Sequence, residues 1–320
     1  MGISREQALD CFQNDDLIGI GMEADAVRRK LHPEGVVSYV VDRVVFCPVP
    51  GTEAMYGKIR ETIEMGGTGI VLQGTVLQGV VTVGPTIDWL EEMLIGIRRQ
   101  FPSLWVHGLS ASEIVAIAAQ AGIPAQETIR RLADAGLSSI AGDDAGILHD
   151  SVQTTVQRCS TEEWIGVHRA AHGLGVRTTA SMTFGVGETM EHRVDHLETL
   201  RRLQEETAGF TAFTPSAFQP VASGVRGFEE ATAVEYLKTL AISRMFLDNI
   251  DNVQADWAKQ GLKVLQMGLR FGGNDVGSVM PGEALIAADG TTEEDLRRVI
   301  RGAGFKPVQR DTLYRTMYLN

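Results

Sequence analysis

Two adjacent carboxylates, Asp143 and Asp144, are the strongest indication of chemistry in this sequence. They follow a short β-rich run and a glycine, where a loop would carry them. Such a pair can act as a general base and a hydrogen-bond acceptor, or bind a cation. Adjacent residues need not face the same way, and aspartates are also common where a helix begins, because they cap it and suit its dipole. Both interpretations stay open for this pair.

Two further side chains are candidates for acid–base chemistry. His107 lies at the end of a predicted strand, and an imidazole suits proton transfer near neutral pH, although a lone histidine on a strand is often part of a core. Glu188 precedes a long predicted helix, where it could equally serve the helix dipole. We predict catalytic roles for Asp143, Asp144, Glu188 and His107.

Polar residues near the ends of later strands are candidates for binding a substrate. Asn274, Asp275 and Ser278 belong to a glycine-containing loop after the predicted last strand. Gln219 and Gln254 end two earlier strands with amides that could bind hydroxyl groups or a purine-like edge. In a barrel, the loops after the last strands commonly receive anionic or polar ligand groups. We therefore predict that these five side chains bind substrate.

The three cysteines, Cys11, Cys47 and Cys159, lie far apart. Their odd number and wide spacing argue against a disulfide framework or a zinc site, so we predict no metal site and a reducing, cytoplasmic setting. Cys47 could be a buried wall residue, an isolated nucleophile or a ligand to another metal. We favour the wall residue, because no basic neighbour in the sequence would lower the pKa of its thiol.

The elements that must position these groups repeat as helix, glycine and short β-rich run. Glycine supplies the left-handed turn that ends a helix before the next strand. The predicted strands are residues 36–46, 69–74, 104–108, 138–141, 176–184, 210–214, 252–255 and 270–273. About eight repeats favour an α/β fold of the (β/α) TIM-barrel type, complete or nearly complete. A doubly wound sheet is the alternative, but no Gly-x-Gly-x-x-Gly turn follows an early strand.

Capping pairs predict where two of the helices begin. Ser160 with Glu163 opens one helix, and Thr291 with Glu294 opens a late one. Four histidines fall on helical patterns with charged neighbours, so we predict that they lie on the outer surface: His168, His172, His192 and His196.

The domain organisation follows from the same pattern. Residues 1–35 are predicted to form a helical N-terminal extension across the bottom or side of the barrel. Residues 36–320 are predicted to form a single barrel domain, because no low-complexity tract or Pro/Gly-rich linker divides them.

Composition limits the partners. The 320 residues include 44% hydrophobic and 22% charged residues, as in a globular protein with a substantial core. The net charge of −12 disfavours nucleic acid and anionic membranes. The N-terminus has no apolar secretory core, and no segment is long and apolar enough to span a bilayer. We expect a small-molecule substrate, no nucleic-acid partner and no membrane partner.

Long strings in the second half resemble a known family. They are RTTASMTFG (177–185), GFTAFTPSAFQP (209–220), NVQADWAKQG (252–261), GGNDVGS (272–278) and QRDTLYR (309–315). From about Tyr39 to Arg315 the chain resembles the radical S-adenosylmethionine enzymes that make menaquinone precursors, most closely the dehypoxanthine futalosine cyclase family. The resemblance implies a (β/α) barrel. In that family the loop after the first strand carries Cys-x-x-x-Cys-x-x-Cys, which holds a [4Fe–4S] cluster.

Departures from the family's pattern gather at the ends of strands. Cys47 stands alone where the family has three cysteines. The family's Gln-Gly-Gly turn, which receives the methionine amino group, reads Gln73-Gly74-Thr75, so we predict that Gln73 and Thr75 line the binding site. The family's Gly-Gly-Gly-Ala-Glu becomes the loop of Asp143 and Asp144. One thiolate cannot replace three, so we expect no cofactor: a [4Fe–4S] cluster is not expected, and S-adenosylmethionine is a low-ranked alternative.

The preferred hypothesis is a cluster-less barrel enzyme that acts on a small polar metabolite, such as a nucleoside-like compound. It would use non-radical acid–base or template chemistry, as a lyase, isomerase or cyclase. One alternative is a non-catalytic protein that binds a metabolite or a partner. Another is an enzyme that binds S-adenosylmethionine as a non-radical reactant.

Overall fold

The computed structural model describes residues 2–46, 52–73, 86–152, 159–224, 227–280 and 290–318. One parallel sheet of these residues has the order β2 (Asp42–Phe46), β3 (Gly69–Gln73), β4 (Trp105–Ser110), β5 (Ser139–Ala141), β6 (Arg177–Phe184), β7 (Phe210–Ala217) and β8 (Asn252–Val253). A second has the order β11 (Met317–Tyr318), β10 (Lys306–Arg310), β1 (Val36–Val40) and β9 (Asp275–Ser278). The predicted α/β class with a parallel sheet is confirmed.

The two sheets join into a ring. β1 and β2 are two halves of one extended run, separated by Val41. At the other end, Gln254, just after β8, bridges in parallel to Asp275 on β9. Because β9 also pairs in parallel with β1, the strands close around a central axis, as a (β/α) barrel requires.

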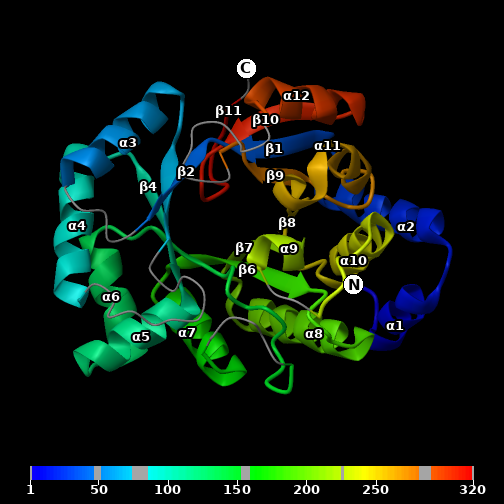
Figure 1. Cartoon of the computed structure of the whole chain (residues 1–320), viewed down its shortest axis with the longest axis horizontal. Helices are drawn as coiled ribbons and strands as arrows, with labels where there is room; N and C mark the ends of the chain where they lie inside the picture. The colour runs from blue at the N-terminus through cyan, green and yellow to red at the C-terminus, as the bar shows by residue number, and fades with distance from the viewer. Residues whose placement is uncertain are drawn as a thin grey trace.

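Helices form an outer layer around the strands (Figure 1). They are α3 (Thr52–Glu64), α4 (Ile87–Gln100), α5 (Ala111–Ala121), α6 (Ala125–Ala135), α7 (Thr161–Gly173), α8 (Met190–Thr207), α10 (Ala233–Phe246), α11 (Trp257–Gly268) and α12 (Glu293–Gly302), with the short α9 (Pro220–Ser223) after β7. The apolar core lies mainly between this layer and the strands: for example, Phe184 of β6 stacks on Tyr236 of α10.

The capping pairs locate one helix start correctly and miss the other by a residue. Ser160 and Glu163 form the predicted capping box at the start of α7. The late helix α12 begins instead with a box between Thr292 and Asp295, so the predicted Thr291–Glu294 pair is wrong. Two adjacent threonines and three acidic residues offer two possible pairs, and the sequence alone does not distinguish them.

The predicted strand at residues 270–273 is wrong. These residues form the turn after α11, and the strand β9 begins at Asp275. Gly272 makes this turn possible: its φ is +98°, and a Cβ there would lie 2.7 Å from the side chain of Arg244. The apolar Phe271 therefore packs into the core from a turn. The strand β10 was not predicted, because Lys306-Pro-Val-Gln-Arg310 has little apolar character.

The four histidines predicted on the outer surface are buried, wholly or in part. His168 and His196 are fully buried, and His172 and His192 are partly buried. Nδ1 of His168 lies 2.9 Å and Nε2 of His172 lies 2.8 Å from the hydroxyl of Thr178 on β6. Burial lowers the pKa of His168 and of His172, that of His172 to about 4. Charged neighbours in sequence occupy the opposite face of α7, so they did not indicate where the histidines point.

The first two helices precede the barrel strands. α1 (Arg5–Gln13) and α2 (Leu17–Leu31) pack outside α8 and α10, beside the ring of strands (Figure 1). The division of the chain at residue 35 stays a prediction. Among the described residues, no helix has the length and apolar character needed to cross a membrane.

Replacing Asp275 by Asn tests the closure of the ring. The buried Asp275 carboxylate accepts two hydrogen bonds from Arg310, at 2.6 and 3.0 Å, and one from Ser38 on β1. Asp275→Asn leaves the guanidinium without its counter-charge, so we expect the free energy of unfolding to fall by about 3–5 kcal/mol. Chemical denaturation measures it. Glu127→Gln, which breaks an exposed ion pair with Arg130 on α6, is the control and should change stability little. Equal losses in the two variants would contradict this account.

Candidate active site

A cavity of about 390 Å³ lies inside the barrel. Its wall includes alternate residues of β6 and β7, namely Thr179, Ser181, Thr183, Thr214 and Ser216. Barrel interiors are usually filled by bulky branched side chains. Small hydroxyl residues at these inward positions leave space and supply hydrogen-bonding groups, so the interior suits a polar ligand.

Asp143 follows β5, and its side chain lines this cavity. Gly142 before it allows β5 to approach β6, because a Cβ there would lie 2.0 Å from the backbone oxygen of Thr179. The Asp143 side chain is exposed to the cavity, but many protein atoms lie around its carboxyl group and displace water. This partial loss of water, with the nearby charges of Asp144 and Glu113, raises the pKa of Asp143 to about 7. A carboxyl group with this pKa can exchange protons near neutral pH.

Asp144 points into the protein framework. Its carboxylate accepts hydrogen bonds from the backbone N–H of Ser112, at 2.8 Å, and the indole of Trp164, at 3.1 Å. It therefore stabilises the first turn of α5 and ties it to α7. The two adjacent carboxylates thus face different ways, and Asp143 is the one in the cavity.

His107 on β4 also lines the cavity. Its Nδ1 lies 2.7 Å from the hydroxyl of Ser139 on the neighbouring strand. Burial and the charge of Arg310 lower the pKa of His107 to about 4. The imidazole is therefore neutral near pH 7 and can offer a hydrogen bond to a ligand.

Glu188 has a buried side chain that binds the protein itself. It accepts hydrogen bonds from the backbone N–H groups of Gly185 and Val186, both at 2.8 Å, and from Arg193 at 2.7 Å. These bonds fold the loop after β6 back onto α8. Glu188 does not line the cavity among the described residues.

Two of the predicted substrate ligands, Gln254 and Ser278, line the cavity. Gln254 accepts a hydrogen bond from Thr214 at 2.9 Å and donates one to the hydroxyl of Tyr314 at 3.0 Å. Ser278 donates to the backbone oxygen of Asp42 at 2.6 Å.

The other predicted ligands lie elsewhere. Asn274 is buried and binds Arg244, Val253 and Asn252, while Asp275 holds Arg310. Gln73 is exposed at the end of β3, and Gln219 lies just after β7; neither lines the cavity. Thr75 and Cys47 lie outside the described residues.

Several cavity residues were missed by sequence reasoning. Asp42, Thr312 and Tyr314 meet at one part of the wall, where Thr312 donates to Asp42 at 2.9 Å. Burial raises the pKa of Asp42 to about 6. On another part of the wall, Lys259 and Asp256 follow β8. The period-two pattern of hydroxyl residues in β6 and β7 could have indicated a polar interior, whereas nothing local in the sequence indicates Asp42.

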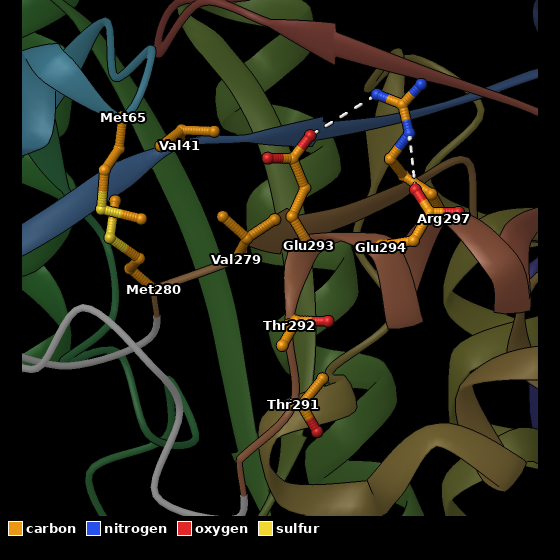
Figure 2. A pocket seen from close by; sticks show the side chains of 9 residues that line it. All are labelled: Val41, Met65, Val279, Met280, Thr291, Thr292, Glu293, Glu294 and Arg297. Atoms are coloured by element: carbon orange, nitrogen blue, oxygen red, sulfur yellow. Dashed lines mark hydrogen bonds and ion pairs between the residues drawn. The ribbon is translucent and has the colours of Figure 1, made fainter.

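A second pocket, of about 440 Å³, lies outside the barrel beside α12 (Figure 2). Met65 and Met280 approach each other along its apolar side. At its rim, carboxylate oxygens of Glu293 and Glu294 each lie 3.5 Å from the guanidinium of Arg297, so these charges pair with one another. The barrel cavity holds the shifted acid–base groups, and we take it as the candidate active site.

Comparison with known proteins identifies relatives along nearly the whole chain. Residues 207–319 match the CofH/MqnC C-terminal region. The chain is 36% identical to cyclic dehypoxanthine futalosine synthase of Halalkalibacterium halodurans, over 98% of this chain and 90% of the relative. It is 35% identical to 5-amino-6-(D-ribitylamino)uracil–L-tyrosine 4-hydroxyphenyl transferase of Methanococcoides burtonii, over 81% and 76%.

Solved structures share the fold. The FeFe-hydrogenase maturase HydG from Carboxydothermus hydrogenoformans superposes with a TM-score of 0.75 over 98% of this chain and 78% of that chain, at 14% identity. Methylornithine synthase (PylB) gives 0.72 over 96% and 94%, at 13% identity. These likenesses support the barrel architecture.

The expectation that the protein uses no cofactor is contradicted by the sequence relatives. Cyclic dehypoxanthine futalosine synthases are radical S-adenosylmethionine enzymes, which bind a [4Fe–4S] cluster and S-adenosylmethionine. The expectation rested on substitutions in a few loops, among them Cys47 and Thr75. Similarity over 98% of the chain outweighs those local departures.

The described cysteines do not match the family's way of holding a cluster. Cys11 lies on α1, on the outside of the barrel, and Cys159 lies just before α7. Cys47 is outside the described residues. Within the described ranges, no group of three His, Cys, Asp or Glu side chains could hold a metal ion. The described residues therefore include no loop with three cysteines.

Replacing Glu188 by Gln tests its structural role. The amide cannot accept all three hydrogen bonds as a charged group does, so we expect a loss of about 1–3 kcal/mol in the free energy of unfolding. We also expect faster amide hydrogen exchange at Gly185 and Val186, measured by mass spectrometry. Glu191→Gln, at an exposed position on α8, is the control. Unchanged exchange in the Glu188 variant would contradict the role.

The fold and the relatives lead to one conclusion. The strands close into a (β/α) barrel, and 36% identity extends over 98% of the chain. The chain belongs to the radical S-adenosylmethionine enzyme family that includes cyclic dehypoxanthine futalosine synthase.

Proposed function

We propose that this protein is an enzyme that acts on a small, polar, nucleoside-like metabolite inside the barrel, with Asp143 moving a proton. The observation that carries the proposal is the Asp143 carboxyl group, whose pKa is raised to about 7 and which opens into a hydroxyl-lined cavity. Catalytic acids and bases work best when their pKa lies near the pH of the reaction.

The cavity supports the proposed class of substrate. Its volume of about 390 Å³ falls in the range of small-molecule sites. Hydroxyl groups of Ser181, Thr183 and Ser278 and the amide of Gln254 suit the hydroxyl groups of a sugar. Two of the relatives are named cyclic dehypoxanthine futalosine synthase. Dehypoxanthine futalosine, or a similar glycosylated acid, is therefore the first substrate to test.

Asp143 and His107 have complementary roles in this proposal. Asp143 accepts a proton from the substrate and returns it, while the neutral His107 donates or accepts a hydrogen bond beside it. Proton transfers of this kind serve a lyase, an isomerase or a cyclase. Asp144 and Glu188 support the loops that carry these groups.

The turnover experiment supplies the family's cofactors. Protein reconstituted anaerobically with iron and sulfide is mixed with dehypoxanthine futalosine, S-adenosylmethionine and a reductant, and products are followed by mass spectrometry. We expect consumption of the nucleoside and a new product. Binding of the nucleoside without any product, with or without these additions, would instead support a non-catalytic role.

Asp143 and Asp144 form a matched pair of variants. Asp143→Asn keeps the shape of the side chain but cannot take a proton, so we expect kcat to fall by about 10²–10⁴-fold with little change in stability. Asp144→Asn should lower the melting temperature, because it weakens the bonds to Ser112 and Trp164, while the folded fraction keeps its activity. The opposite pattern would assign the base to Asp144.

The proposed base also predicts a pH dependence. Asp143 must be deprotonated to accept a proton, so kcat/KM should rise as the pH increases through about 7 and then level off. His107, with a pKa of about 4, stays neutral throughout and should add no second inflection above pH 5. The profile is measured with wild type and Asp143→Asn. An inflection near pH 7 that survives in the variant would exclude Asp143 as its source.

A further inference from the structure

Lys259 is held at the wall of the barrel cavity by a short chain of hydrogen bonds. Its ammonium donates to the hydroxyl of Ser216 at 2.6 Å, and this hydroxyl donates to Asp256 at 2.6 Å. Asp256 also caps α11 by accepting from the backbone N–H of Lys259 at 3.3 Å. Helix, strand and cap therefore fix the direction of the lysine side chain, and both Lys259 and Ser216 line the cavity.

The positive charge of Lys259 is available to a ligand. An ammonium has three N–H donors, and one of them binds Ser216. No carboxylate of the described residues forms an ion pair with it within 4 Å, although its charge acts on Asp143 and opposes the rise in the pKa of that carboxyl group. The other cation of the cavity wall, Arg310, differs in this respect, because Asp275 binds it at two points and its guanidinium lies over the ring of Tyr314.

The surrounding charges limit what Lys259 can bind. Asp143 and Asp256 line the same cavity, so a doubly charged group such as a phosphate would meet repulsion from two sides. A carboxylate carries a single negative charge, which one ammonium can balance. Its oxygens can also accept hydrogen bonds from the two N–H donors that Ser216 leaves available.

We infer that Lys259 forms a subsite that binds a carboxylate of the substrate, in the same cavity as the base Asp143. This inference rests on the proposed function, because it takes the cavity as the place where substrate binds. It adds a position for the acid group of the glycosylated acid proposed above: the carboxylate lies at Lys259, and the hydroxyl groups of the substrate lie along β6, β7 and Gln254. Lys259 is then a residue that positions substrate and determines specificity.

The test compares an acid with its neutral amide. D-gluconate and D-gluconamide carry the same hydroxyl groups and differ in charge, and ligand-observed NMR measures their dissociation constants. We expect Lys259→Met to weaken gluconate binding by at least about tenfold and to leave gluconamide unchanged. Lys259→Arg, which keeps the charge, should retain most of the gluconate affinity. The control is Lys263→Met, at an exposed position beyond the break in α11 at Gly261, and it should bind both compounds like wild type.

Two outcomes would overturn the inference: equal gluconate affinity in wild type and Lys259→Met, or equal losses for gluconate and gluconamide. Inorganic phosphate that competes for Lys259 more strongly than gluconate would overturn the choice of a carboxylate. Thermal melting verifies that each variant is folded. The Asp143→Asn variant separates this inference from the proposed function, because it should lose turnover and still bind gluconate. If Asp143→Asn keeps its turnover while Lys259→Met loses gluconate binding, Asp143 is not the base, and the carboxylate subsite at Lys259 is supported.

Discussion

The barrel depends on the buried pair between Asp275 and Arg310. Asp275 belongs to β9, Arg310 to β10, and the hydroxyl of Ser38 on β1 binds the same carboxylate. Three strands from distant parts of the chain are thus joined at one point, where the sheet of β2–β8 meets the rest of the ring. A buried charge pair has a large desolvation cost, and its compensation depends on complete hydrogen bonding. Arg310 meets this demand with Asp275, the backbone of Asp311 and the ring of Tyr314.

A closed ring with small inward side chains explains why chemistry can occur inside it. Ser and Thr replace the large residues that fill most barrels, so the interior keeps a cavity with charged groups around it. The protein atoms around the cavity raise the pKa of Asp143 and Asp42 and lower that of His107. These opposite shifts share their largest cause, since loss of water disfavours the charged form of each group. Near pH 7 the imidazole is therefore neutral, whereas Asp143 is divided between its protonated and ionised forms.

Much of the fold followed from the sequence, because glycine-terminated helices and β-rich runs are local signals. Ser160 with Glu163 and most of the strand positions are examples. The errors arose where local signals were ambiguous or absent, as at Thr291 and Thr292, in the turn at residues 270–273, and in β10, whose polar residues resemble a loop. The orientation of adjacent side chains was not readable either: Asp143 and Asp144 are equivalent in sequence, and tertiary contacts with Ser112 and Trp164 separate them. Thr312, which binds Asp42, and Ser216, which binds the ammonium of Lys259, come from distant parts of the chain, so no local pattern could indicate these contacts.

The position of Arg310, Thr312 and Tyr314 has a consequence during synthesis of the protein. These three residues form part of the cavity wall, and β10 pairs with β1, which precedes it by most of the barrel. On the ribosome, β1 cannot form this pairing until every segment between it and β10 has been made. The nascent barrel therefore has an incomplete cavity until β10 and the residues just after it have emerged.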